Sequence, residues 1–160
     1  MTPPVDTPAI RAAVEAGVAH RIVTFGAVRS LAEAAERRGI DLAQIVKTLV
    51  VRRGEGDHLL VLVPGDRVID WRALRAHLGV ARLSLAEAEE ARLVTGYERG
   101  TITPFGAPAH LAVLADSRVD TPGEVSVGGG AHGVAIHLDG RDLVAAVGAD
   151  VADVTTSAGA

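Results

Sequence analysis

The sequence contains no cysteine and very few aromatic side chains. The absence of cysteine excludes disulfide bonds, cysteine-ligated zinc and a cysteine nucleophile. The aromatic residues are one tryptophan, one tyrosine and two phenylalanines, so a nucleic-acid platform built from several stacking rings is not expected.

Long apolar runs, an N-terminal export signal and an excess of positive charge are missing as well. No segment approaches the roughly 20 consecutive apolar residues of a membrane-spanning helix. Residues 1–6 show neither the basic nor the apolar region of a signal peptide, so we expect a cytoplasmic protein. The net charge of −4 argues against a protein that binds long stretches of nucleic acid, but it is compatible with an enzyme that binds only the end of an RNA.

Lysine occurs only once, at Lys47, whereas the other 15 of the 16 basic residues are arginine. An ammonium group offers a compact charge, three rotatable donors and a pKa that shifts readily, and a guanidinium cannot imitate this combination. Alternation along the apolar segment 45–53 places Lys47, Leu49 and Val51 on one face and Thr48 on the other. A lysine at the start of an apolar strand commonly protects a sheet edge from aggregation, so this role and a functional role are both open for Lys47.

The remaining pattern predicts a single α+β domain that covers residues 1–160. The chain has 160 residues, of which 48% are hydrophobic and 22% charged, as in an ordinary globular domain. Capping residues and glycines predict helices at 7–17, 30–39, 70–77, 84–96 and 141–147. Apolar β-rich runs predict strands at 45–53, 58–63, 111–114, 124–127, 134–138 and 151–154. Hairpins between helices favour a mixed sheet, and residues 155–160 are expected to form a frayed tail.

Two glycine-rich segments are candidates for contact with a ligand. Residues 96–106 combine three glycines with a proline, which indicates either a shaped loop that presents N–H groups to an anion or an ordinary connection. Residues 128–133 match GxGxxG, but a strand rather than a helix is expected to follow, so a tight turn is the better interpretation. His132 lies beside this turn. The six histidines are too scattered for a metal set, and neither a metal nor a cofactor is expected.

The segment 46–50 (VKTLV), the Gly100-x-x-x-Pro104 loop and the glycine turn at 128–133 occur in a characteristic order and spacing. Together they resemble the YbaK/EbsC family of aminoacyl-tRNA deacylases, which is related to the editing domain of prolyl-tRNA synthetase. Segments 63–66 and 148–154 are similar to that family too, so the resemblance covers about residues 8–154. It implies a mixed, partly barrel-like β-sheet flanked by helices.

The resemblance also implies a function, which is trans-editing hydrolysis of mischarged aminoacyl-tRNA, above all tRNA(Pro) that carries a small amino acid such as cysteine or alanine. The expected partners are the acceptor end of aminoacyl-tRNA and prolyl-tRNA synthetase, with no membrane and no DNA. Lys47 and Gly100 are the expected catalytic residues. The expected substrate-binding residues are Phe25, Thr48, Pro104, Gly128, Gly129 and His132.

The glycine turn differs from that of family members that remove cysteine. Those members tend to have Ser-Gly-Gly followed by paired arginines, whereas this chain has three glycines at 128–130 and then Ala131 and His132. Alanine or another small side chain therefore stays open as the substrate.

The chemistry requires no strong protein nucleophile, because the ester between an amino acid and the terminal ribose is activated. We expect the ammonium form of Lys47 to anchor the terminal phosphate or to polarise the ester, and N–H groups near Gly100 to stabilise the oxyanion. The attacking group would be water, or a hydroxyl or thiol of the substrate itself. Two alternatives remain open, namely a non-catalytic member that binds aminoacyl-tRNA or a synthetase, and a small nucleotide-binding oxidoreductase suggested by GxGxxG alone.

Overall fold

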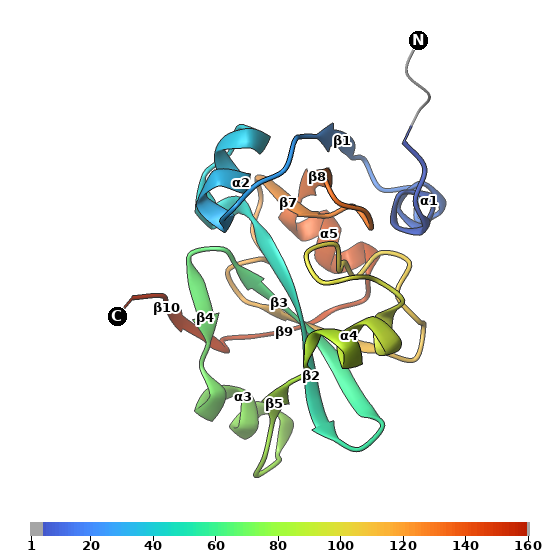
Figure 1. The fold of residues 1–160 in the computed structure, drawn as a ribbon. Helices are drawn as coiled ribbons and strands as arrows, with labels where there is room; N and C mark the ends of the chain where they lie inside the picture. Colours follow the sequence, from blue (N-terminus) through green and yellow to red (C-terminus); the bar gives the residue numbers. More distant parts are fainter. Residues whose placement is uncertain (1–4, 160) are drawn as a thin grey trace.

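Residues 5–159 are described by a computed structural model in which short helices and strands alternate irregularly along the chain (Figure 1). The helices are α1 (Pro8–Glu15), α2 (Leu31–Arg38), α3 (Trp71–Leu78), α4 (Ala88–Thr95) and α5 (Gly140–Ala146), with a short 3-10 helix, η1 (Leu42–Gln44). The strands are β1 (Arg21–Thr24), β2 (Val46–Gly54), β3 (Asp57–Pro64), β4 (Arg67–Ile69), β5 (Ser84–Leu85), β6 (Ala112–Asp116), β7 (Glu124–Gly128), β8 (Val134–Asp139), β9 (Asp150–Ala152) and β10 (Thr155–Ser157). Within the described residues, no helix is both long enough and apolar enough to span a membrane.

The strands form a mixed sheet and two smaller antiparallel sheets. The mixed sheet has the order β5-β2-β3-β6-β9, with β2 antiparallel to β3 and β6 parallel to both β3 and β9. The smaller sheets have the orders β1-β8-β7 and β10-β4. The predicted α+β class with a mixed sheet is confirmed. The sheet is not closed into a barrel, because its outer strands β5 and β9 are not paired with each other.

The β2–β3 hairpin is the centre of the fold, and its two faces pack against different cores. Val51, paired with Leu59, belongs to a core that α3 completes through Leu74. On the opposite face, Val46 and Leu62 join a core that extends to α1, β8 and α5. Since burial of each such side chain contributes about 1.5–3 kcal/mol, the hairpin is held firmly in register by both cores.

The ends of most helices are set by the residues that the sequence predicts. The side chains of Thr7, Ser30 and Asp70 each accept a hydrogen bond from the backbone of the first helical turn. Gly39 and Gly79 follow α2 and α3 with φ of 74° and 69°, a conformation that glycine adopts without steric cost. The predictions for these helices are confirmed to within one or two residues.

The predicted start of the fourth helix is wrong. Ser84 and Leu85 do not cap a helix; they form β5 and pair with Arg52 and Val51 of β2. The helix α4 begins only at Ala88, after Glu87. The unpaired outer edge of β2 offers hydrogen-bonding partners to this segment, and pairing with that edge outweighs the local capping pattern.

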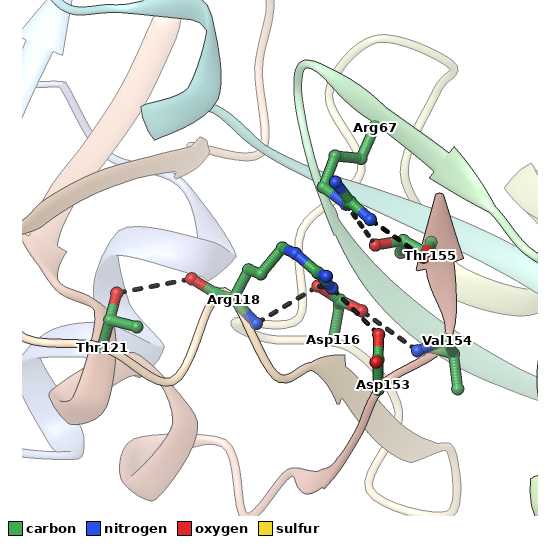
Figure 2. Close-up of polar contacts among 7 residues, drawn as sticks. All are labelled: Arg67, Asp116, Arg118, Thr121, Asp153, Val154 and Thr155. Carbon is green, nitrogen blue, oxygen red and sulfur yellow. Dashed lines mark hydrogen bonds and ion pairs between the residues drawn. The ribbon is translucent and has the colours of Figure 1, made fainter. Parts of the chain in front are cut away.

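The expectation of a frayed tail is also wrong for residues 155–157, which form β10 and pair with β4. Figure 2 shows the side chains that fasten this segment. Arg67 donates from Nε to Thr155 Oγ1 at 2.7 Å and from Nη2 to the Thr155 carbonyl at 3.0 Å. The fully buried carboxylate of Asp116 accepts from the Val154 amide at 3.1 Å and from the Arg118 amide at 3.2 Å. The C-terminal segment is therefore an integral part of the fold.

Candidate active site

A cavity of about 530 Å³ lies along the outer edge of β2, with walls formed by α2, β2, β5, α4, the loop 96–106 and the end of β7. In the described residues, β2 has no strand neighbour on the side away from β3 between Val46 and Val50. The cavity therefore follows an open sheet edge and takes in residues from both faces of β2. Its volume lies within the usual range for sites that bind small molecules or cofactors.

Lys47 lies half-buried on the wall of this cavity. Its Nζ donates a hydrogen bond of 2.5 Å to the backbone carbonyl of Arg67. Burial lowers the pKa of Lys47 from its ordinary value, while the nearby carboxylate of Asp66 acts in the opposite direction and raises this pKa. Lys47 is thus a positioned ammonium with a depressed pKa, which differs from the fully solvated lysine of a protected sheet edge.

The carbonyl that holds Lys47 is itself held by the C-terminal strand. Arg67 lies on β4, which pairs with β10. Two nitrogens of its guanidinium donate hydrogen bonds to Thr155 (Figure 2). This arrangement fixes the backbone at Arg67 and hence the acceptor for Lys47 Nζ. Residues 155–157 therefore contribute to the geometry of the cavity at a distance.

Thr48 points to the face of β2 opposite to that of Lys47 and also lines the cavity. The residue is only 9% exposed, and its Oγ1 has no hydrogen-bond partner in the described residues. A buried hydroxyl without a partner costs free energy, so natural proteins rarely retain one unless a ligand or water satisfies it. Thr48 thus supplies an unsatisfied polar group beside the lysine.

Arg38, at the end of α2, is a cavity residue that the sequence did not indicate. Its Nη1 donates to Ser126 Oγ at 3.0 Å, and its guanidinium carbon lies 4.8 Å from the centre of the Phe25 ring. The Nε atom is buried without a partner, and burial lowers the pKa of this side chain from its ordinary value. A double arginine in the last turn of a helix is common because it complements the helix dipole, so the sequence carried no distinctive signal.

Gly100 lines the cavity with φ of 88°, in a loop that internal hydrogen bonds hold in shape. Tyr97 donates from its hydroxyl to the Phe105 carbonyl at 2.7 Å, and Thr101 donates from its hydroxyl to the Glu98 carbonyl at 2.8 Å. None of the hydrogen bonds found in residues 5–159 uses the Gly100 amide. The loop therefore has a fixed conformation, and its Gly100 N–H group is available to bind an anion.

Gly128, at the end of β7, packs directly beneath this loop. A Cβ atom at Gly128 would lie 2.7 Å from the carbonyl oxygen of Ile102, closer than any side chain tolerates. The absence of a side chain at Gly128 thus allows the glycine turn and the Gly100 loop to approach each other at the cavity.

The structure divides the eight sequence-predicted site residues into three groups. Lys47, Thr48, Gly100 and Gly128 line the cavity. Phe25 and His132 each lie next to a lining residue. The Phe25 ring stacks on the Arg38 guanidinium, and the His132 ring is near the place where a side chain at Gly100 would begin. His132 is exposed, and its Nε2 lies 3.4 Å from a carboxylate oxygen of Glu98.

The third group, Pro104 and Gly129, does not line the cavity. Pro104 is buried and borders a separate cavity of about 180 Å³. The Gly129 carbonyl accepts a hydrogen bond of 2.6 Å from Thr7 Oγ1, and its amide donates to the Val134 carbonyl at 2.9 Å. These two residues shape the loop and the turn through packing.

The glycine turn does not have the context of a dinucleotide site. Strand β8 begins at Val134, directly after the turn, so the helix that a dinucleotide fingerprint requires is absent there. Among residues 5–159, no group of three or more histidine, aspartate or glutamate side chains is close enough to hold a metal ion.

Comparison with known proteins identifies the family to which this arrangement belongs. Residues 26–146 match the family described as the aminoacyl-tRNA editing domain. The chain belongs to this family. The match includes the β2 segment, the Gly100 loop and the glycine turn, and it confirms the resemblance inferred from them.

The relatives include a tRNA deacylase and proline–tRNA ligases. The chain is 35% identical over 103 residues to the multifunctional Ser/Thr-tRNA deacylase ProXp-y of Escherichia coli (strain K12), which covers 62% of either protein. It is 34% identical over 100 residues to the proline–tRNA ligase of Trichlorobacter lovleyi, which covers 62% of the chain but only 17% of the ligase. A crystal structure described as a candidate trans-editing enzyme for prolyl tRNA synthetase superposes with a TM-score of 0.83 at 31% identity, over 96% of this chain and 100% of that one.

Proposed function

We infer that this protein hydrolyses the ester of mischarged aminoacyl-tRNA and that it is a trans-editing enzyme for tRNA(Pro) carrying a small amino acid. Membership of the editing family supports the reaction class. The name of the E. coli relative and the description of the trans-editing structure support deacylation of mischarged tRNA.

The observation that carries this proposal is the set of polar groups on one cavity. Three lining residues carry these groups: Lys47 has a half-buried ammonium, the Oγ1 of Thr48 has no partner, and the amide of Gly100 is not engaged in a hydrogen bond. A ligand with several acceptor oxygens satisfies such a set, and the ester, ribose and phosphate of an aminoacylated terminal nucleotide provide them. The ligand's α-ammonium group needs an opposite charge, and Glu87 is the acidic side chain on the wall.

The residues suggest a mechanism without a covalent enzyme intermediate. Water, or a hydroxyl of the amino acid, attacks the ester carbonyl carbon, and negative charge develops on the carbonyl oxygen. The Gly100 amide and the Lys47 ammonium stabilise this oxyanion. The intermediate then collapses: the ester C–O bond breaks, and the ribose oxygen takes up the proton that the attacking group has lost. Donors fixed in place before the reaction are effective because they need no reorganisation as the charge develops.

An editing enzyme for tRNA(Pro) is expected to act on small amino acids, because the synthetase cannot fully exclude them. A pocket that must accept proline discriminates against smaller side chains by only about 1–3 kcal/mol for each missing methylene. A second, smaller site can hydrolyse what the first one admits. The cavity is bordered here by Val46, Leu49 and Ile102, which limit the space for a side chain.

A panel of purified aminoacyl-tRNAs tests the proposed function. We expect tRNA(Pro) charged with alanine, serine, threonine or cysteine to lose its amino acid faster with the protein than without it, and prolyl-tRNA(Pro) to stay intact. Deacylation of none of these substrates above the spontaneous rate would leave the protein as a non-catalytic binder.

Replacement of Thr48 by valine is expected to separate stability from activity. Because the Oγ1 atom is buried without a partner, its removal should raise the free energy of unfolding by about 1 kcal/mol. The loss of a polar contact to substrate should lower kcat/KM about 10-fold. Chemical denaturation and single-turnover deacylation measure the two effects.

Thr95→Val is the matched control for the stability effect. The Thr95 hydroxyl donates to the Ala91 carbonyl at 2.8 Å and accepts from the Tyr97 amide at 3.1 Å, so the same chemical change should destabilise the protein. If both valine variants are destabilised equally, the Thr48 hydroxyl is satisfied within the protein and the proposed contact is wrong.

Replacement of Asp66 by asparagine is expected to change the pH dependence of deacylation. Asp66 raises the pKa of Lys47, so its neutralisation should lower that pKa further. Lys47 acts as an ammonium, and activity is therefore lost as pH rises through this pKa. The alkaline limb of the kcat/KM profile should move to lower pH in Asp66→Asn. Asp142→Asn, on the exposed surface of α5, removes the same charge and should leave the profile in place.

A further inference from the structure

Four arginines surround a groove of about 510 Å³ that is separate from the lysine cavity. Arg52 and Arg53 come from the end of β2, Arg75 from α3, and Arg82 from the segment between α3 and β5. In Figure 1 these elements gather at one end of the molecule, next to the tip of the β2–β3 hairpin. The lining described for this groove includes no acidic side chain. This is notable in a chain whose acidic residues outnumber its basic residues by 20 to 16.

The positive charge of the groove is only partly neutralised by ion pairs. Arg53 pairs with Asp57 at 3.0 Å and Arg52 with Glu90 at 3.5 Å, both at partly exposed positions where ion pairs contribute little. Arg75 and Arg82 take part in none of the ion pairs found among residues 5–159. The helix dipole at the end of α3 accounts for one arginine, but not for the four that converge here.

The groove and the lysine cavity share the strand β5 as a wall. Ser84 lines the groove, and the next residue, Leu85, lines the cavity. Pairing of Ser84 with Arg52 and of Leu85 with Val51 fixes both to the edge of β2. The three residue-to-residue steps from Arg82 to Leu85 span at most about 10 Å, so a ligand chain that leaves the cavity reaches the arginines within a few nucleotides.

We propose that this arginine groove binds the phosphates of the single-stranded 3′ end of tRNA, upstream of the terminal nucleotide that enters the lysine cavity. The proposal rests on the proposed editing function. Guanidinium groups match phosphate geometry well, and the groove presents charge without aromatic rings, so it holds the backbone and does not read the bases. A short positive groove also explains how an acidic protein binds only the end of an RNA.

Two substrates of different length test the groove separately from catalysis. Alanyl-tRNA(Pro) carries the upstream phosphates, whereas 3′-O-alanyl-adenosine carries none of them. In the double variant Arg75→Gln and Arg82→Gln, KM for alanyl-tRNA(Pro) should rise at least about 10-fold with kcat unchanged. The kcat/KM of the double variant for alanyl-adenosine should equal that of the wild-type protein. The slope of log(kcat/KM) against log salt for the tRNA should become shallower by about 1.4, as expected for two lost phosphate contacts.

Arg141→Gln, which removes an exposed arginine of α5 that is in no ion pair of the described residues, is the charge control and should behave as wild type. The groove proposal is overturned if KM for the tRNA is unchanged in the double variant, or if kcat/KM for alanyl-adenosine falls as much as that for the tRNA. Hydrolysis by the wild-type protein would still support the editing function in either case. Absence of hydrolysis of both substrates by wild-type protein overturns the editing function and the groove proposal together.

Discussion

Lys47→Met is expected to lower kcat/KM for deacylation by about 100- to 1000-fold, the usual effect of removing one donor that stabilises an oxyanion. Methionine keeps most of the volume and the unbranched shape of lysine but has no charge and no donor. The substitution also removes a half-buried cation whose pKa is depressed by burial, so the fold should tolerate it. Single-turnover deacylation of alanyl-tRNA(Pro), with thermal unfolding as the check on folding, measures the effect.

Lys47→Arg distinguishes a general need for charge from a need for an ammonium. The planar guanidinium is larger and cannot form the 2.5 Å hydrogen bond from Nζ to the Arg67 carbonyl with the same geometry. We therefore expect this variant to lose most of the activity despite its retained charge. Full activity in Lys47→Arg would show that the single lysine of this chain has no special role.

Gly128→Ala is expected to damage both stability and activity. The new Cβ would lie 2.7 Å from the Ile102 carbonyl oxygen, so the loop that carries Gly100 must move away from β7. Overpacking of this kind costs about 1–3 kcal/mol of unfolding free energy. Displacement of the Gly100 amide by even 1 Å should lower kcat by about 100-fold. Denaturant unfolding and deacylation of the same preparation report the two losses.

Gly54→Ala is the matched control for this prediction. A Cβ at Gly54 would meet nothing within 4 Å, and φ at this position is not in the left-handed region. The same chemical change should therefore leave unfolding and hydrolysis of alanyl-adenosine unchanged. Equal behaviour of the two alanine variants would mean that the contact between Gly128 and the loop does not maintain the site.

The parts of the fold that were predictable from sequence are those decided by local interactions. Thr7, Ser30 and Asp70 cap helices through contacts within one turn. The hairpin between β2 and β3 follows from the apolar runs at 45–53 and 58–63 and the short connection between them. The placement of Lys47 and Thr48 on opposite faces of one strand follows from the same alternation. Such features depend on neighbours in sequence, so the sequence carries their signal.

The features that escaped prediction depend on partners far away in the chain. Ser84 has the local pattern of a helix cap, but the open edge of β2 pairs with it instead. Thr155 lies in a polar segment that looks like a tail, yet Arg67 binds it across 88 residues. Arg38 reaches the cavity beside Ser126 of β7, a residue 88 positions away that accepts its hydrogen bond. No local pattern reports these contacts.

The Nζ signal of Lys47 gives the most direct test of the central claim, that this ammonium contacts the aminoacyl end of the substrate. Because the chain has a single lysine, protein labelled with ¹⁵N-lysine gives one side-chain ammonium resonance in NMR. We predict a titration of this signal at lower pH than for an ordinary lysine, and a change in its shift and pKa when a non-hydrolysable 3′-amide analogue of alanyl-adenosine saturates the protein. A signal that the bound analogue leaves unchanged would contradict the claim.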